Sequence, residues 1–239
     1  MHGHTEEAGP MKYLTPIAVV LAGGLIALAV FYNHGTTTTP QAPTPPGGQP
    51  AAAAVNIKDV NTANEPFIGQ ANAPVTIAEW SDYQCPYCKQ FEQQTLPQII
   101  SDYVNAGKVK VVFKSFAFLG NDSISAELYA RSVWKLYPSQ YFAWRTAMYN
   151  AQDQEGDQGF GNAASIDKLD ATVPGLDAAK IKSDVAANTA AYQAAADADK
   201  AEAAKLGIQG TPAFVIGTTL LPGAYPYSNF KPLIDAQLK

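Results

Sequence analysis

The sequence predicts an α/β domain that contains a long helical insertion and is preceded by a single transmembrane helix. Three observations support this class. Strand-type segments flank a helical segment that begins near residue 85, and two more follow from residue 213. Between them, from about 121 to 206, the pattern is helical. An uncharged apolar run covers 14–32. With 239 residues, of which 47% are hydrophobic, the chain can bury one sizeable core.

The first part of the chain is expected to be a membrane anchor. The segment 14–32 is apolar and uncharged, and its length is close to the ~20 residues that span a bilayer as a helix. Lys12 precedes it and the next charged residue is Lys58. This asymmetry places the tail, 1–13, in the cytoplasm and the bulk of the chain on the extracytoplasmic side of the cell membrane. A cleaved signal peptide that starts at Met11 is the alternative, but the apolar run is long for such a peptide and favours an anchor.

A linker of residues 33–55 is predicted between the anchor and the globular domain. It is rich in Thr, Pro, Gly and Ala and contains no Lys, Arg, Asp or Glu. Such a composition does not bury enough apolar surface to offset the entropy of the chain, and it is typical of a semi-extended tether. The folded domain is therefore expected to comprise residues 56–239.

The first half of this domain has a strand, a helix and a second strand in order. Residues 75–80 are of strand-forming types, and so are residues 108–116. A helix is expected from 85 to 105 between them. Pro97 lies inside this helix and should kink it, because proline has no backbone N–H and clashes with the preceding turn. Gly107 is a suitable residue to end the helix.

Three helices are expected in the insertion. Asp122 and Ser123 are residue types that cap helix N-termini and are expected to begin the first helix. Pro138 should end it. The patterns of 141–152 and 177–206 predict the second and third helices.

The end of the chain returns to strand signals. Residues 213–217 and 218–221 predict two strands joined by a tight turn, and residues 228–238 predict a closing helix. The expected order is thus β, α, β, helical insertion, β, β, α.

The only two cysteines, Cys85 and Cys88, lie in the tetrapeptide Cys-Pro-Tyr-Cys. A C-x-x-C pair directly after a strand is typical of a dithiol that cycles between reduced and disulfide states. Cys85 is the expected nucleophile, because the helix N-terminus that follows it favours a thiolate. Pro86 is tolerated in the first turn of the helix, where its missing N–H would have no partner. Cys88 is then the resolving thiol, and Tyr87 separates the two without adding a charge.

Composition argues against other kinds of site. A static disulfide that closes so short a loop removes little entropy from the unfolded chain. A zinc site needs about four ligands, but there is no third cysteine and the three histidines, His2, His4 and His34, lie outside the expected domain. The net charge of −5 and the absence of a basic run argue against nucleic acid as a partner. The sequence therefore predicts neither a metal nor a cofactor.

Two segments carry a resemblance to a known family. Residues 79–88, EWSDYQCPYC, and residues 207–214, GIQGTPAF, resemble the DsbA-like thiol oxidoreductases of the thioredoxin superfamily, in particular the membrane-tethered group. The resemblance covers about 60–238 and implies a thioredoxin-like fold. It also implies that Thr211 and Pro212 form the cis-proline loop, which lies against the sulfurs and presents backbone groups to the substrate. An ordinary trans proline at the start of a strand is the alternative.

The resemblance also implies a role for Glu79. In this family the position often holds a buried acid beneath the resolving thiol, where burial raises the pKa of the carboxyl group. Glu79 would then relay the proton that Cys88 must lose before it attacks. The alternative is a carboxylate at a strand edge that faces solvent.

The implied activity is thiol–disulfide exchange with cysteine-containing exported proteins, in the direction that donates disulfides to them. The resemblance implies a DsbB- or VKOR-like membrane oxidoreductase as the partner that restores the enzyme disulfide. Tyr87 stands where the most strongly oxidising members have a histidine, so isomerase or reductase duties remain alternatives. A non-enzymatic dithiol that binds a soft metal or senses redox state is the alternative from another class. The tetrapeptide also suggests a glutathione-linked reductase, against which export argues.

Overall fold

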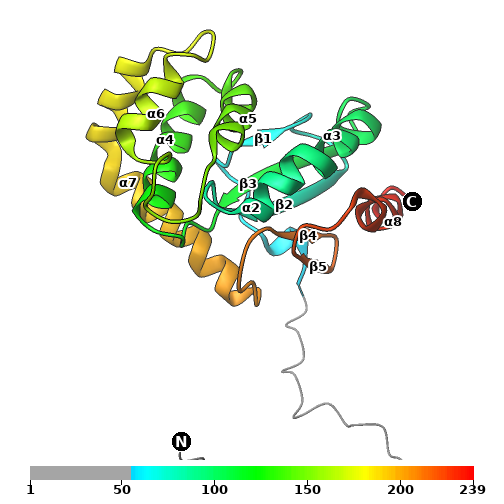
Figure 1. Ribbon diagram of the computed structural model, residues 1–239. Coiled ribbons are helices and arrows are strands. Elements are labelled where there is room, and N and C mark those ends of the chain that lie inside the picture. Colours follow the sequence, from blue (N-terminus) through cyan, green and yellow to red (C-terminus); the bar gives the residue numbers. More distant parts are fainter. Residues whose placement is uncertain (1–54) are drawn as a thin grey trace, which may run out of the picture. The chain divides into compact units, whose positions relative to one another are not determined.

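The computed structural model describes residues 55–239 (Figure 1). The predicted tail, 1–13, and transmembrane helix, 14–32, lie outside the described residues, as does the predicted linker except for its last residue. That residue, Val55, is buried in the core. Within the described part of the chain, no helix is both long enough and apolar enough to cross a membrane.

One five-stranded sheet, in the order β1-β3-β2-β4-β5, forms the centre of the domain. Its strands are β1 (Phe67–Ile68), β2 (Val75–Ser81), β3 (Val109–Ser115), β4 (Ala213–Ile216) and β5 (Thr219–Pro222). The central pair β2 and β3 is parallel, and the other neighbouring pairs are antiparallel. The four predicted strands are confirmed, while β1 was missed because it is only two residues long and follows several turn-forming residues.

The helix after the cysteines is continuous but irregular. It is built of α2 (Pro86–Gln90), η3 (Phe91–Thr95), α3 (Leu96–Ile99) and η4 (Ile100–Val104), of which η3 and η4 have π-helical hydrogen bonding. The irregularity surrounds Pro97, which lies in the first turn of α3. The predicted disturbance at this proline therefore takes the form of wider turns on either side.

The remaining helices are η2 (Ile57–Asp59), α4 (Asn121–Leu136), α5 (Tyr141–Ala151), α6 (Ala163–Asp170), α7 (Ala178–Lys205) and α8 (Tyr227–Gln237). Helices α4 to α7 form the insertion and are grouped together at the left of Figure 1, whereas α8 lies apart from them at the right. The predicted helices are confirmed, and η2 and α6 were missed. Its N-terminus is capped by Asn162, whose side chain accepts the N–H of Ser165 at 3.0 Å.

The expected cap of α4 is wrong. Asp122 and Ser123 lie inside the first turn, after Gly120 at the cap position. The capping oxygen comes instead from Asp157, which accepts the N–H of Asp122 at 2.9 Å and the side-chain amide of Asn121 at 2.6 Å. The residue that caps this helix is therefore 35 positions away in sequence, which explains why the local pattern misplaced it.

Successive side chains of β2 point to opposite faces of the sheet, and each face is covered by its own apolar cluster. Ile77 belongs to the larger cluster, which includes both cysteines. Ala78 and Trp80 belong to the smaller one. Glu79 therefore points to the same face as Ile77, which is the face that holds the cysteines.

Candidate active site

The two cysteines lie at the start of α2, directly after the loop that leaves β2. Cys85 occupies the N-cap position with extended backbone, and Pro86 is the first helical residue. Both thiols are free. Cys88 is completely buried and its N–H bonds to the carbonyl of Cys85 at 3.1 Å. Tyr87, between them, is 61% exposed, so it lies on the surface beside the reactive sulfur.

The two sulfurs have opposite acidities. The pKa of Cys85 is lowered to about 6, chiefly by a hydrogen bond from the Cys88 thiol. Burial opposes this lowering, while Thr211 and the N–H groups of Cys88 and Tyr87 add to it. Burial raises the pKa of Cys88 well above its usual range, and its hydrogen bond to Cys85 raises it further. At neutral pH, Cys85 is therefore a thiolate and Cys88 is a thiol, as a nucleophile and a resolving group require.

The segment Thr211–Pro212 lies against the first sulfur. The bond between these residues is cis, and Cys85 Sγ lies 3.4 Å from the carbonyl oxygen of Thr211, to which it donates a hydrogen bond when it is protonated. The carbonyl of Pro212 accepts the N–H of Gly223 at 2.7 Å, which ties the segment to the turn after β5. The tertiary structure thus joins two motifs that are 126 residues apart.

Glu79 lies on β2 and is fully buried, so the solvent-facing alternative is wrong. Burial raises the pKa of its carboxyl group to about 7. The guanidinium of Arg145, 3.0 Å from Oε1, opposes this rise, whereas the charge of Glu92 adds to it. The charge of Glu79 in turn raises the pKa of Cys88. A carboxyl group with a pKa near neutrality and electrostatic coupling to the resolving thiol can accept or donate a proton there.

A family model described as thioredoxin matches residues 61–236. A curated relative, disulfide bond formation protein D of Bacillus subtilis, is 28% identical over 175 residues, which are 73% of this chain and 78% of the relative. This chain belongs to the thioredoxin family as a DsbA-like thiol:disulfide oxidoreductase.

Solved structures of this family agree with the fold. Oxidised BdbD from B. subtilis superposes with a TM-score of 0.70 at 24% identity and covers 78% of this chain and 98% of its own. The catalytic domain of Proteus mirabilis ScsC has a TM-score of 0.59 at 30% identity, with coverage of 74% and 91%. The thioredoxin-like α/β fold with a helical insertion is therefore confirmed.

Several residues of the oxidoreductase site were missed in the sequence. The carboxylate of Asp82 accepts the N–H groups of Gln84, Phe118 and Leu119 at 2.8, 2.9 and 3.2 Å. It thereby fixes the loop before the cysteines to the loop after β3. Arg145 and Gln152, both from the region of α5, also reach the site. The available signal for Arg145 was its position as the one charged residue among the aromatic and apolar residues of 141–149.

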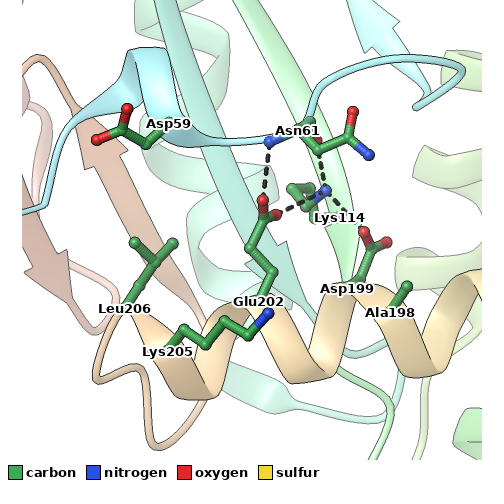
Figure 2. Close-up of a pocket in the computed structure, with 8 residues that line it drawn as sticks. All are labelled: Asp59, Asn61, Lys114, Ala198, Asp199, Glu202, Lys205 and Leu206. Carbon is green, nitrogen blue, oxygen red and sulfur yellow. Dashed lines mark hydrogen bonds and ion pairs between the residues drawn. The ribbon is translucent and has the colours of Figure 1, made fainter.

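A separate cavity of about 420 Å³ lies away from these residues (Figure 2). At its base, the ammonium of Lys114 lies 2.6 Å from the carboxylate of Asp199 and 3.0 Å from that of Glu202. It also donates to the carbonyl of Asn61 at 2.6 Å. None of the predicted site residues lines this cavity. Lys114, Asp199 and Glu202 are paired with one another and, with Asn61, connect β3 with α7 and the residues before β1.

Proposed function

We propose that this oxidoreductase donates the Cys85–Cys88 disulfide to cysteine-containing proteins outside the cytoplasm. The observation that supports it best is the lowered pKa of Cys85, about 6, beside a fully buried Cys88 whose pKa is raised. A stabilised thiolate stabilises the reduced form of the enzyme, and this makes its disulfide a better oxidant. The name of the Bacillus relative, disulfide bond formation protein D, supports the same direction.

The proposed reaction is two successive exchanges. A substrate thiolate attacks Cys85 Sγ, the Cys85–Cys88 bond breaks, and Cys88 leaves as a thiolate that takes up a proton. A second substrate thiolate then attacks the substrate sulfur of the mixed disulfide and releases Cys85 as a thiolate. Two electrons pass from the substrate to the enzyme, and the substrate gains one disulfide.

In this proposal the segment Thr211–Pro212 receives the substrate chain next to Cys85, because its backbone lies in contact with that sulfur. Glu79 supplies the proton that Cys88 takes up and removes it in the reverse step. The roles of Cys85 and Cys88 as nucleophile and resolving thiol are supported by their opposite pKa shifts.

The proposed location is the extracytoplasmic face of the cell membrane. The apolar segment 14–32 and the charge-free stretch after it support a tethered domain. We further propose that a DsbB- or VKOR-like membrane oxidoreductase accepts the two electrons from reduced Cys85 and Cys88. A tether would keep the domain near such a partner and raise its effective concentration.

One observation favours reductase or isomerase activity as a second candidate. Tyr87 is uncharged and mostly exposed, so the dipeptide between the cysteines adds no positive charge to stabilise the thiolate of Cys85. Less stabilisation of the reduced form makes the couple less oxidising.

The reduction potential distinguishes these candidates. Full-length protein in detergent micelles is equilibrated with glutathione buffers, and the fraction of reduced Cys85 and Cys88 is counted by alkylation and mass spectrometry. A potential of ~−120 to −180 mV, with catalysed oxidation of a reduced unfolded protein, supports the oxidase. A potential near ~−270 mV assigns a reductase and contradicts the proposal.

A further inference from the structure

One buried guanidinium connects two acidic groups beneath the cysteines. Arg145 comes from α5 in the helical insertion and is 1% exposed. Its Nη2 lies 3.0 Å from Oε1 of Glu79 on β2, and its Nε lies 3.0 Å from Oε2 of Glu92 on η3. Both carboxylates are buried. These three groups form the Arg145 cluster.

The sheet itself places no cation beside the acid of β2. The residue opposite Glu79 on the neighbouring parallel strand is Phe113. The guanidinium carbon of Arg145 lies 3.9 Å from the centre of the Phe113 ring, so the ring and the guanidinium form a cation–π contact. The insertion therefore supplies the positive charge that the strand lacks.

The cluster contains one more acidic group than basic groups. With both carboxylates ionised, its net charge would be −1, which is costly in a buried site. Both oxygens of Glu92 have partners, because Oε1 accepts from the hydroxyl of Thr146 at 3.2 Å. Within the described part of the chain, Oε2 of Glu79 is buried without a partner. Glu79 is therefore the member that can bind a proton, and Oε2 is the atom that can hold it.

Other titratable groups also face Glu79. Cys85 and Cys88 lie at the start of α2, and Tyr149 lies on α5 one turn after Arg145. The charges of Cys85 and Glu92 raise the pKa of Glu79, and among these neighbours Arg145 alone lowers it.

We propose that Arg145 is a positioning residue for thiol exchange: it holds Oε1 of Glu79 and leaves Oε2 free to exchange a proton with Cys88. In the resolving step, the proton of the Cys88 thiol moves to Glu79. The Cys88 thiolate then attacks Cys85 Sγ, the bond between Cys85 and its partner sulfur breaks, and the partner leaves as a thiolate. The inference rests on the proposed role of Glu79.

The test is the pH dependence of this resolving step. The mixed disulfide of Cys85 with glutathione is formed in the full-length protein, and the rate at which glutathione is released is followed by stopped flow from pH 5 to 9. In the unaltered protein the rate should rise with an inflection near the Glu79 pKa of about 7. Arg145→Met should move the inflection upward by about one unit or more, because the neutral carboxyl is then favoured. The rate at pH 6 should fall about tenfold.

Two further variants keep the test decisive if Arg145→Met folds poorly. Arg145→Lys retains the charge without the planar fork, and its inflection should lie between those of the two others. Glu92→Gln removes the competing acid and should move the inflection downward. Opposite shifts in Arg145→Met and Glu92→Gln are not expected from a general loss of stability.

A matched control is Arg131→Lys, since Arg131 is also paired with several carboxylates, but in a different network. In Arg131→Lys, the inflection of the glutathione-release rate against pH should stay where it is in the unaltered protein. An unchanged inflection in both Arg145 variants, or shifts of the same direction in Arg145→Met and Glu92→Gln, would overturn the inference. If Glu79→Gln retains the inflection, the proposed role of Glu79 fails as well. The reduction potential tests the direction of transfer separately.

Discussion

The side-chain amide of Gln152 lies 3.0 Å from the carbonyl oxygen of Cys85. The same nitrogen also donates to the carbonyl of Tyr83 at 2.7 Å. Gln152 follows the last residue of α5, so the insertion is bonded directly to the loop that positions the nucleophile. The insertion thus contributes to the site at two points, through Gln152 and through Arg145.

Replacing Gln152 by leucine should destabilise the domain. The carbonyl of Tyr83 would lose its side-chain donor, and that of Cys85 would keep only its bonds from the N–H groups of Cys88 and Lys89. The expected cost is about 1–3 kcal/mol in the free energy of unfolding. Urea unfolding of the reduced protein measures this. Gln193 is half-buried and its side-chain amide donates to Asp197 in an exposed hydrogen bond, so Gln193→Leu should change the free energy by less than about 0.5 kcal/mol. Equal stability of the two variants would show that the bonds of Gln152 contribute nothing.

The acidity of Cys85 should depend on the hydrogen bond that Cys88 donates to it. The rate of alkylation of Cys85 by iodoacetamide should titrate with a pKa of about 6. Cys88→Ala removes the donor and should raise this pKa, whereas Cys88→Ser retains a hydroxyl donor and should raise it less. Identical titrations of the two variants would assign the low pKa to the helix N-terminus instead.

Stability should fall as the pH rises from about 5 to 8. Several acids that are buried or nearly so have raised pKa values, among them Glu79 and Glu127 at about 7 and Glu65 at about 8, each mainly through burial. Since these groups bind more protons in the folded than in the unfolded state over this range, the stability that their protonation provides is lost as the pH rises through the folded values. Urea unfolding of the oxidised protein at pH 5, 6.5 and 8 measures the trend. In the disulfide Cys85 does not titrate, whereas in the reduced protein its lowered pKa of about 6 would add stability as the pH rises. Glu65→Gln should reduce it, and a slope unaffected by this change would contradict the assignment.

The ion pairs of Lys114 should stabilise the fold without affecting the thiols. Lys114→Met leaves Glu202 without its cation and Asp199 with Arg131 alone (Figure 2), and the loss of one partner of a buried pair costs about 3–5 kcal/mol. Lys182→Met removes an exposed pair with Asp167 and should cost at most about 1 kcal/mol. Thermal unfolding compares the two, and the alkylation titration of Cys85 should be the same in both.

Local pattern identified most of the elements of the fold but not all. Periodicity and turn residues located β2, β3, β4, β5 and the helices other than η2 and α6, because each has a run of suitable residues. The cap of α4 was misplaced since Asp157, its actual cap, comes from a distant loop. β1 is too short to have a pattern of its own and is defined by its pairing with β3.

The sequence by itself determined the dithiol, the order of the strands and helices other than η2, β1 and α6, and the second motif at Thr211 and Pro212, because these depend on residues close together along the chain. Only the tertiary structure decided the surroundings of Glu79. Arg145 reaches it from 66 residues away, since β3 offers Phe113 at the adjacent position and the insertion folds back over that ring. The ionisation of a buried acid depends on the groups packed around it in space, and that packing is set by long-range contacts that no short segment encodes.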